Sequence, residues 1–236
     1  MTTSKAQIKK THAKKENKQV LKKREEWAVK IPRFFGTPLA RGITYLPVKI
    51  HPNIITLFSL FFAITAAFFF FNNQLILGAL FFFISYVFDC ADGTLARLTG
   101  MESRFGQRLD FYVDTIGNIF MYFGLWYSQF YLHDQWFLGG AIIATHYIVM
   151  AFGYIFIKDR TYKTISPYVC SYYGAADEGF LTFFFLPITE FFIAGIFRLA
   201  LPILVILQLV SYSILFFRQK EKPDIKDNIK KMLKIK

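Results

Sequence analysis

Long apolar runs separated by short polar stretches dominate the chain between residues 54 and 217. A helix needs about 20 mostly apolar residues to cross the hydrocarbon core of a bilayer. The pattern therefore predicts six membrane-spanning helices, at residues 54–71, 75–95, 109–132, 136–157, 180–197 and 201–217. The second run is apolar only as far as Phe88, and the fifth contains Pro187 and Glu190. We expect an all-α, polytopic membrane bundle formed by residues 51–217.

The flanking segments have different patterns. Residues 1–26 are rich in lysine and almost free of large apolar side chains, which is typical of a disordered arm. Residues 27–50 interleave aromatic, aliphatic and basic side chains, a pattern that favours an amphipathic segment at the membrane interface. We expect prolines to break this segment into short pieces, at Pro32, Pro38 and Pro47. Residues 218–236 form a basic tail.

The formal net charge of +12 is confined to the two ends of the chain. Residues 1–50 carry a net charge of +10 and residues 218–236 one of +5, whereas residues 51–217 carry −3. Basic flanks beside apolar spans indicate cytoplasmic ends that are attracted to anionic lipid headgroups, so we expect no nucleic-acid partner. With six spans, both termini are predicted to be cytoplasmic.

Four carboxylates stand where a lipid-exposed helix should have none: Asp89 and Asp92 late in the second run, Asp110 and Asp114 early in the third. Spacings of three and four residues place each pair on one face of its helix. The two helices are antiparallel neighbours joined by a short cytoplasmic connection, so the pairs should meet at one depth. Clustered carboxylates favour a hard cation, Mg²⁺ or Mn²⁺, and two such ions would suit phosphoryl chemistry. The carboxylates alone leave open a charge-paired helix contact and a cation site in a transporter.

The residues around these carboxylates form a fixed pattern: Asp89-Cys-Ala-Asp92-Gly93-Thr-Leu-Ala96-Arg97, eight residues, Gly106, three residues, Asp110, three residues, Asp114. This resembles at every defining position the signature D-x2-D-G-x2-A-R-x8-G-x3-D-x3-D of the CDP-alcohol phosphotransferase (CDP-alcohol phosphatidyltransferase) family. A second similar feature, Pro52-Asn53-Ile-Ile-Thr56, opens the first span. The resemblance extends from about residue 27 to residue 217.

The resemblance implies a role for each matching residue. Asp89, Asp92 and Asp110 would be metal ligands, and Asp114 would touch the metal site and act as the catalytic base. The CDP-linked donor would be bound by residues that surround the carboxylates, namely Pro52, Asn53, Thr56, Gly93, Ala96, Arg97, Ser103 and Gly106. The implied reaction is phosphatidyl transfer, from CDP-diacylglycerol to a small polar alcohol with release of CMP, in phospholipid biosynthesis. A CDP-linked soluble alcohol transferred onto a lipid hydroxyl remains an alternative, and the acceptor stays open.

Other polar residues allow two interpretations each. Lys158 and Arg160 either bind an acceptor phosphate or simply flank the fourth span. His146 is expected to be a hydrogen-bonded helix contact, and Glu190 to pair within the bundle or in a homodimer. Asp177 and Glu178 are expected to cap the fifth span. Two rival functions remain, an aspartate-rich membrane prenyltransferase and a cation transporter.

Overall fold

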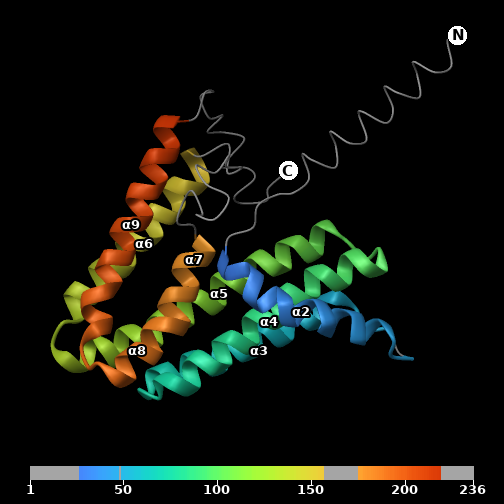
Figure 1. Ribbon diagram of the computed structural model, residues 1–236, viewed down its shortest axis with the longest axis horizontal. Helices are drawn as coiled ribbons and strands as arrows, with labels where there is room; N and C mark the ends of the chain where they lie inside the picture. Colours follow the sequence, from blue (N-terminus) through green and yellow to red (C-terminus); the bar gives the residue numbers. More distant parts are fainter. Residues whose placement is uncertain (1–26, 48, 157–174, 219–236) are drawn as a thin grey trace, which may run out of the picture.

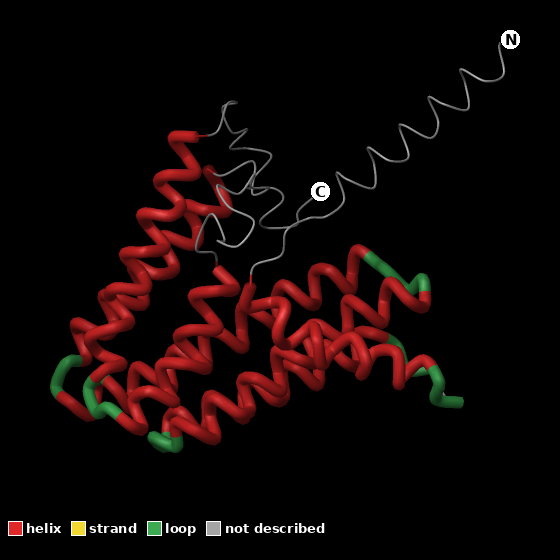
Figure 2. The backbone as a smooth tube through the Cα atoms, in the orientation of Figure 1, coloured by secondary structure: helices red, strands yellow, loops and turns green. Residues whose placement is uncertain are grey.

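The computed structural model describes residues 27–47, 49–156 and 175–218, and these residues form helices joined by short connections (Figures 1 and 2). The predicted arm at residues 1–26 and most of the predicted tail at residues 218–236 lie outside the described residues. The long helices are α2 (Trp27–Thr44), α3 (Pro52–Phe71), α4 (Leu75–Thr99), α5 (Arg104–Gln129), α6 (Trp136–Phe156) and α9 (Ile196–Arg218). Between α6 and α9 lie α7 (Ala175–Phe180), a π-helical turn (Leu181–Phe185) and α8 (Leu186–Phe192).

The all-α prediction is confirmed for the described part of the chain, where no strand occurs. Four helices are long and apolar enough to cross a membrane: α3, α4, residues Trp136–Gly153 of α6 and residues Ile196–Ile214 of α9. Helix α5 has the length of a span, but its first three turns carry Arg104, Arg108, Asp110 and Asp114. The predicted fifth span is divided, because a π-helical turn separates α7 from α8.

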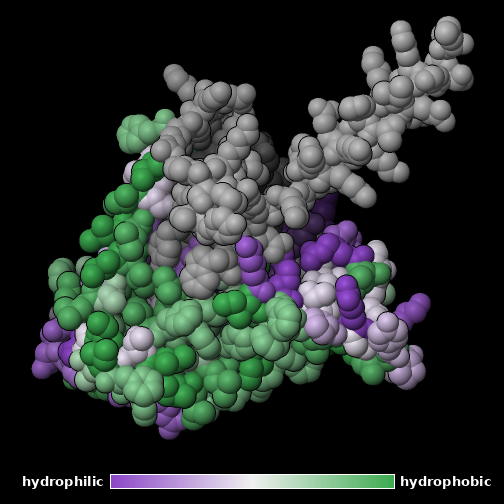
Figure 3. Space-filling model, viewed as in Figure 1, coloured by the Kyte–Doolittle hydropathy of each residue, from purple (hydrophilic) through white to green (hydrophobic). Residues whose placement is uncertain are grey.

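Apolar side chains cover much of the surface, as expected for a protein whose solvent is partly lipid. In Figure 3 they spread over the part of the molecule that contains α6, α8 and α9, whereas hydrophilic side chains gather near the end where α2 lies beside the α4–α5 connection. Exposed aromatic side chains include Phe61, Phe68, Phe137, Phe191 and Phe217. These observations support an integral membrane protein with a polar end at α2, α4 and α5.

The expectation that prolines would break the segment after residue 27 is wrong for Pro32 and Pro38, whereas Pro47 does follow the end of the helix. Helix α2 runs from Trp27 to Thr44 with Pro32 and Pro38 inside it. Packing against α4 offsets the backbone hydrogen bonds that the prolines forgo, since tertiary contacts routinely override local propensity. Gly36 provides the closest approach, because a Cβ atom there would lie 2.8 Å from the Val87 carbonyl oxygen. Helix α2 therefore lies directly against the α4 segment that continues into Asp89 and Asp92.

This close approach predicts that Gly36→Ala destabilises the protein by about 1–3 kcal/mol, the usual cost of overpacking. The added methyl group would meet backbone atoms of α4, which have no alternative rotamer. Gly42→Ala is the matched control, because nothing lies within 4 Å of a Cβ atom at that position of the same helix. It should be neutral or stabilising by up to about 1 kcal/mol. Thermal unfolding in detergent checks the pair, and equal stabilities of the two variants would contradict the packing argument.

The acidic residues at the start of α7 do more than cap a helix. Asp177 Oδ1 accepts a hydrogen bond from the Ala28 backbone N–H of α2 at 3.2 Å. Glu178 Oε1 accepts from the Tyr122 hydroxyl of α5 at 2.8 Å, and its Oε2 lies 3.4 Å from Nδ1 of His146 on α6. His146 is thus a helix contact, as predicted, but its Nδ1 atom makes no hydrogen bond within the described residues. The pair Asp177–Glu178 joins α7 to three other helices.

Glu190 has a local role in the described chain. Its two carboxylate oxygens accept hydrogen bonds from the backbone N–H groups of Gly195 and Phe197, each at 2.7 Å. These donors stand at the start of α9, where the first turn of a helix leaves backbone N–H groups without partners. Glu190 therefore pairs within the bundle, as one of the two sequence interpretations held, and caps α9.

Candidate metal and donor site

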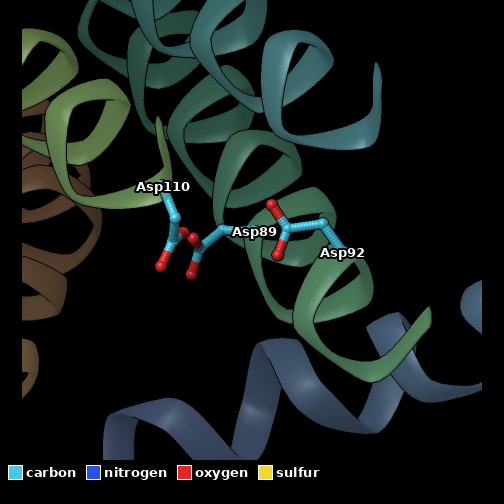
Figure 4. A group of neighbouring side chains, drawn as sticks. All are labelled: Asp89, Asp92 and Asp110. Atoms are coloured by element: carbon cyan, nitrogen blue, oxygen red, sulfur yellow. The ribbon is translucent and has the colours of Figure 1, made fainter. Parts of the chain in front are cut away.

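Three of the four motif carboxylates meet where α4 passes α5. Asp89, Asp92 and Asp110 each place one ligand oxygen so that all three oxygens lie within 4.8 Å of one another. Figure 4 shows the side chains of Asp89 and Asp110 pointing toward one another, with Asp92 beside them on the next turn of α4. Asp92 is buried, with 6% of its surface exposed, and the other two are half-buried. The two carboxylate pairs were predicted to meet, and three of the four carboxylates do: Asp89, Asp92 and Asp110.

Asp114 is not among the three carboxylates whose oxygens lie within 4.8 Å of one another. It follows one turn after Asp110 on α5, and its side chain is exposed. Its negative charge nevertheless acts on Asp89, together with the charges of Asp92 and Asp110. The role of Asp114 as a catalytic base therefore stays a prediction, and its exposure to solvent is compatible with proton exchange.

Both helices are positioned by close packing on α3. A Cβ atom on Gly117 of α5 would lie 2.9 Å from the Ala63 side chain, and one on Gly124 would lie 2.5 Å from the Ala67 carbonyl oxygen. The short connection between α4 and α5 begins at Gly100, whose φ of 68° is left-handed and suits a residue without Cβ. These features bring the end of α4 and the start of α5 together at α3.

The chemistry of this group fits a hard divalent cation. Three carboxylates in a partly dehydrated place repel one another, and a cation would relieve that repulsion. Oxygen-only ligands suit Mg²⁺ or Mn²⁺ rather than a softer metal. Asp89, Asp92 and Asp110 are therefore the residues that could hold an ion. The presence of a second ion remains a prediction.

Five of the residues predicted to bind the donor lie near the starts of α3 and α5, and the other three lie near the end of α4. Ser103 is the N-cap of α5, with its Oγ accepting a hydrogen bond from the Gly106 N–H at 2.9 Å. A Cβ atom at Gly106 would lie 3.1 Å from both Ser103 Oγ and Asn53 Oδ1. Gly106 thus leaves room between two polar side chains, and Pro52 opens α3 beside them. The Asn53 N–H at the start of α3 is likewise capped, because it donates to Nδ1 of His51 at 3.2 Å.

Arg97 lies beside the cluster, on the last turns of α4. Its guanidinium folds back over Gly93, where a Cβ atom would be 3.4 Å from Nη1, and its Nη2 donates to Thr94 Oγ1 at 3.1 Å. The side chain is exposed and so remains open to an anionic ligand. Ala96 is half-buried on the same helix. Lys158 and Arg160 lie outside the described residues.

Sequence reasoning missed one residue that shapes this site and one contact of a residue that it had named. Gly36 of α2 contacts the backbone of α4 beside Asp89, and Thr56 Oγ1 lies 2.6 Å from Asp92 Oδ2. The family resemblance had drawn attention to Thr56 only as a donor contact. No spacing rule links residues in different helices, so these partners required the fold.

Sequence comparison with known proteins finds two relatives that are named as the same kind of synthase. The phosphatidylinositol phosphate synthase of Mycobacterium tuberculosis is 33% identical over 101 residues, which cover 42% of this chain and 46% of that protein. The archaetidylinositol phosphate synthase of Pyrococcus horikoshii is 33% identical over 89 residues, covering 37% and 47% respectively. The aligned region thus spans about half the length of these relatives.

A solved structure shares the fold over most of the chain. The crystal structure of the Mycobacterium tuberculosis phosphatidylinositol phosphate synthase with CDP-DAG bound matches with a TM-score of 0.59 and 18% sequence identity. The match covers 80% of this chain and 96% of that one. The family model of the CDP-alcohol phosphatidyltransferases matches residues 49–218, which include every described site residue. The chain belongs to the CDP-alcohol phosphatidyltransferase family.

Proposed function

We propose that this protein transfers a phosphatidyl group from CDP-diacylglycerol to the hydroxyl of a small polar alcohol, with release of CMP, in phospholipid biosynthesis. The observation that carries the proposal is the group of three carboxylate oxygens within 4.8 Å, contributed by Asp89, Asp92 and Asp110 of the family motif. Family membership and the names of the relatives support it. We further propose six spans, counting α5 and residues 175–192, with both termini and the site on the cytoplasmic side.

Asp89, Asp92 and Asp110 would hold the metal, with Asp114 beside it. A bound Mg²⁺ or Mn²⁺ would supply positive charge to the oxygens of the donor pyrophosphate. Arg97 would add the fixed fork of its guanidinium to the same anionic group, a geometry suited to phosphate. Asn53, Ser103 and Gly106 would receive the CDP moiety near the helix starts.

In the proposed reaction the acceptor oxygen attacks the phosphorus that bears diacylglycerol. A new phosphorus–oxygen bond forms while the bond between that phosphorus and the bridging oxygen of CMP breaks, and CMP leaves with that oxygen. An alcohol is a poor nucleophile near neutral pH, so Asp114 takes its proton as the bond forms. The exposed position of Asp114 allows the proton to pass on to water. Direct displacement is preferred because a metal-bound carboxylate is a weak nucleophile.

The test is a product assay with purified protein in detergent. CDP-diacylglycerol, Mg²⁺ and one alcohol at a time, drawn from glycerol 3-phosphate, inositol phosphate, inositol, serine and choline, should give CMP and a new lipid with at least one acceptor. A prenyltransferase would instead release pyrophosphate from a prenyl diphosphate, and a transporter would move cation into vesicles without CDP. The proposal would be contradicted if no acceptor in this panel gave CMP and a new lipid while the protein showed either the prenyltransferase or the transport activity.

We also propose that Lys158 and Arg160 bind a phosphate on the acceptor. For a phosphorylated acceptor, Lys158→Ala or Arg160→Ala should raise the acceptor KM by roughly 10- to 150-fold, the cost of one charge-assisted hydrogen bond of about 1.5–3 kcal/mol. The KM for the CDP-linked donor should change far less. Arg198→Ala, near the start of α9, is the control. Unchanged acceptor kinetics in both variants would leave these residues as a basic flank of the fourth span.

A further inference from the structure

A ladder of buried hydroxyl groups runs between α3 and α4 and ends at Asp92. Ser85 Oγ of α4 donates to the Ser59 carbonyl oxygen of α3 at 2.8 Å, and Ser59 Oγ donates to the Thr56 carbonyl oxygen at 2.8 Å. Thr56 Oγ1 then lies 2.6 Å from Asp92 Oδ2. These four side chains are between 2% and 9% exposed. In an apolar bundle such buried polar groups persist only when they are hydrogen-bonded, and here each one is.

The Thr56 hydroxyl has one proton and two nearby acceptors. The Pro52 carbonyl oxygen lies 3.3 Å away, and Asp92 Oδ2 lies 2.6 Å away. A separation of about 2.5–2.7 Å is characteristic of a hydroxyl donating to an ionised carboxylate. The Thr56 hydroxyl therefore donates its proton to Asp92 Oδ2 rather than to the Pro52 carbonyl oxygen. Because Ser85 and Ser59 fix the register of α3 against α4, the Thr56 hydroxyl is aimed at one particular oxygen of that carboxylate.

We propose that Thr56 is a positioning residue for the metal ligand Asp92. By holding Oδ2 it would fix the orientation of the carboxylate, which could then hold a divalent cation together with Asp89 and Asp110. This role goes beyond the donor contact that the family resemblance implies for Thr56, and it rests on the proposed function only in taking Asp92 as a ligand. Removing a hydrogen bond to a ligating carboxylate typically weakens metal affinity by roughly 10- to 100-fold.

The experiment measures metal binding directly, without substrate, by titrating Mn²⁺ into the detergent-purified protein and following free Mn²⁺ by electron paramagnetic resonance. Thr56→Val keeps the shape of threonine but lacks its hydroxyl, and it should bind Mn²⁺ roughly 10- to 100-fold more weakly than the wild type. Thr56→Ser keeps a hydroxyl and should restore most of the affinity. Thr65→Val is the matched control on α3, since the Thr65 hydroxyl donates to the Phe61 carbonyl oxygen of its own helix; it should bind as the wild type does.

A parallel titration with CDP separates the two roles of Thr56. Wild-type Mn²⁺ affinity in Thr56→Val would overturn the positioning role, and weakened CDP binding in that same variant would assign Thr56 to the donor. Loss of Mn²⁺ binding in Thr56→Ser equal to that in Thr56→Val would also overturn it, because the hydroxyl would then not be the cause. Should Thr56→Val fail to fold, Thr56→Ala provides the same comparison with a smaller side chain. Absence of Mn²⁺ binding by the wild type would instead remove the metal site, and the proposed function with it.

Discussion

Asp89→Asn is expected to abolish CMP release and to weaken binding of the CDP-linked donor at the same time. An amide has the shape of a carboxylate but carries no charge, so it is a poor substitute for an anionic ligand among three clustered oxygens. Without the ion, the donor pyrophosphate loses its main counter-charge. We expect the turnover rate to fall by at least roughly 10³-fold, the upper end of the cost of one lost electrostatic contact. Asp92→Asn should behave in the same way.

The measurement is donor titration in Mg²⁺ followed by single-turnover CMP release. Asp134→Asn is the control, since Asp134 lies in the connection before α6, and its left-handed φ of 58° suits Asn as well as Asp. Addition of a chelator to the wild type should reproduce the loss seen in Asp89→Asn, and Mg²⁺ or Mn²⁺ should restore activity. Robust CMP release in excess chelator would show that the carboxylates serve another purpose.

Helix ends followed from the sequence at the turn between the first two spans, whereas α5 and α9 begin at Arg104 and Ile196, each five positions before the predicted start. The first predicted span ends at Phe71, as α3 does, because Asn72 and Asn73 follow and Asn73 takes a left-handed φ of 56°. The second predicted span begins at Leu75, as α4 does. Near residue 180 this reasoning failed. Helix α7 already begins at Ala175, and Asp177 and Glu178 lie buried in its first turn, in contact with other helices.

Helix α2 shows where sequence reasoning lacked information. Two prolines within 18 residues predict interruption, yet the helix continues. Its continuity depends on a backbone approach to α4 at Gly36 and on the buried Ala40, and neither residue has a distinctive signal of its own. A glycine in a helix usually marks weakness, so only the facing helix reveals that this one provides contact.

The carboxylates of the site could be found because the chemistry needs them at fixed spacing on two consecutive helices. The spacing also predicted which helix faces meet, and the structure brings Asp89, Asp92 and Asp110 together. What the spacing could not give is the support around them. Ser59 and Ser85 read as ordinary polar residues within apolar runs, and their contact joins two helices across 26 positions of sequence. Such support depends on the register of α3 against α4, which the spacing of residues along the sequence does not reveal.

Asp114→Asn should separate the catalytic base from the metal ligands. Asp114 is exposed and lies outside the three-oxygen group, so an ion held by Asp89, Asp92 and Asp110 should survive its neutralisation. The amide cannot take the proton of the acceptor hydroxyl. We therefore expect nearly unchanged affinity for the CDP-linked donor, while kcat falls by roughly 10²–10⁴, the usual scale for the loss of a general base.

The comparison that decides this role is Asp114→Asn against Asp89→Asn, with Mn²⁺ binding, donor titration and single-turnover CMP release measured for both variants. Asp114→Asn should keep the first two and lose the third, whereas Asp89→Asn should lose all three. A loss confined to the chemical step places the deficit at proton transfer, because both binding equilibria precede it. If Asp114→Asn instead loses Mn²⁺ and donor as fully as Asp89→Asn does, then Asp114 is chiefly a fourth ligand. The proton would then have to leave through another group near the acceptor hydroxyl.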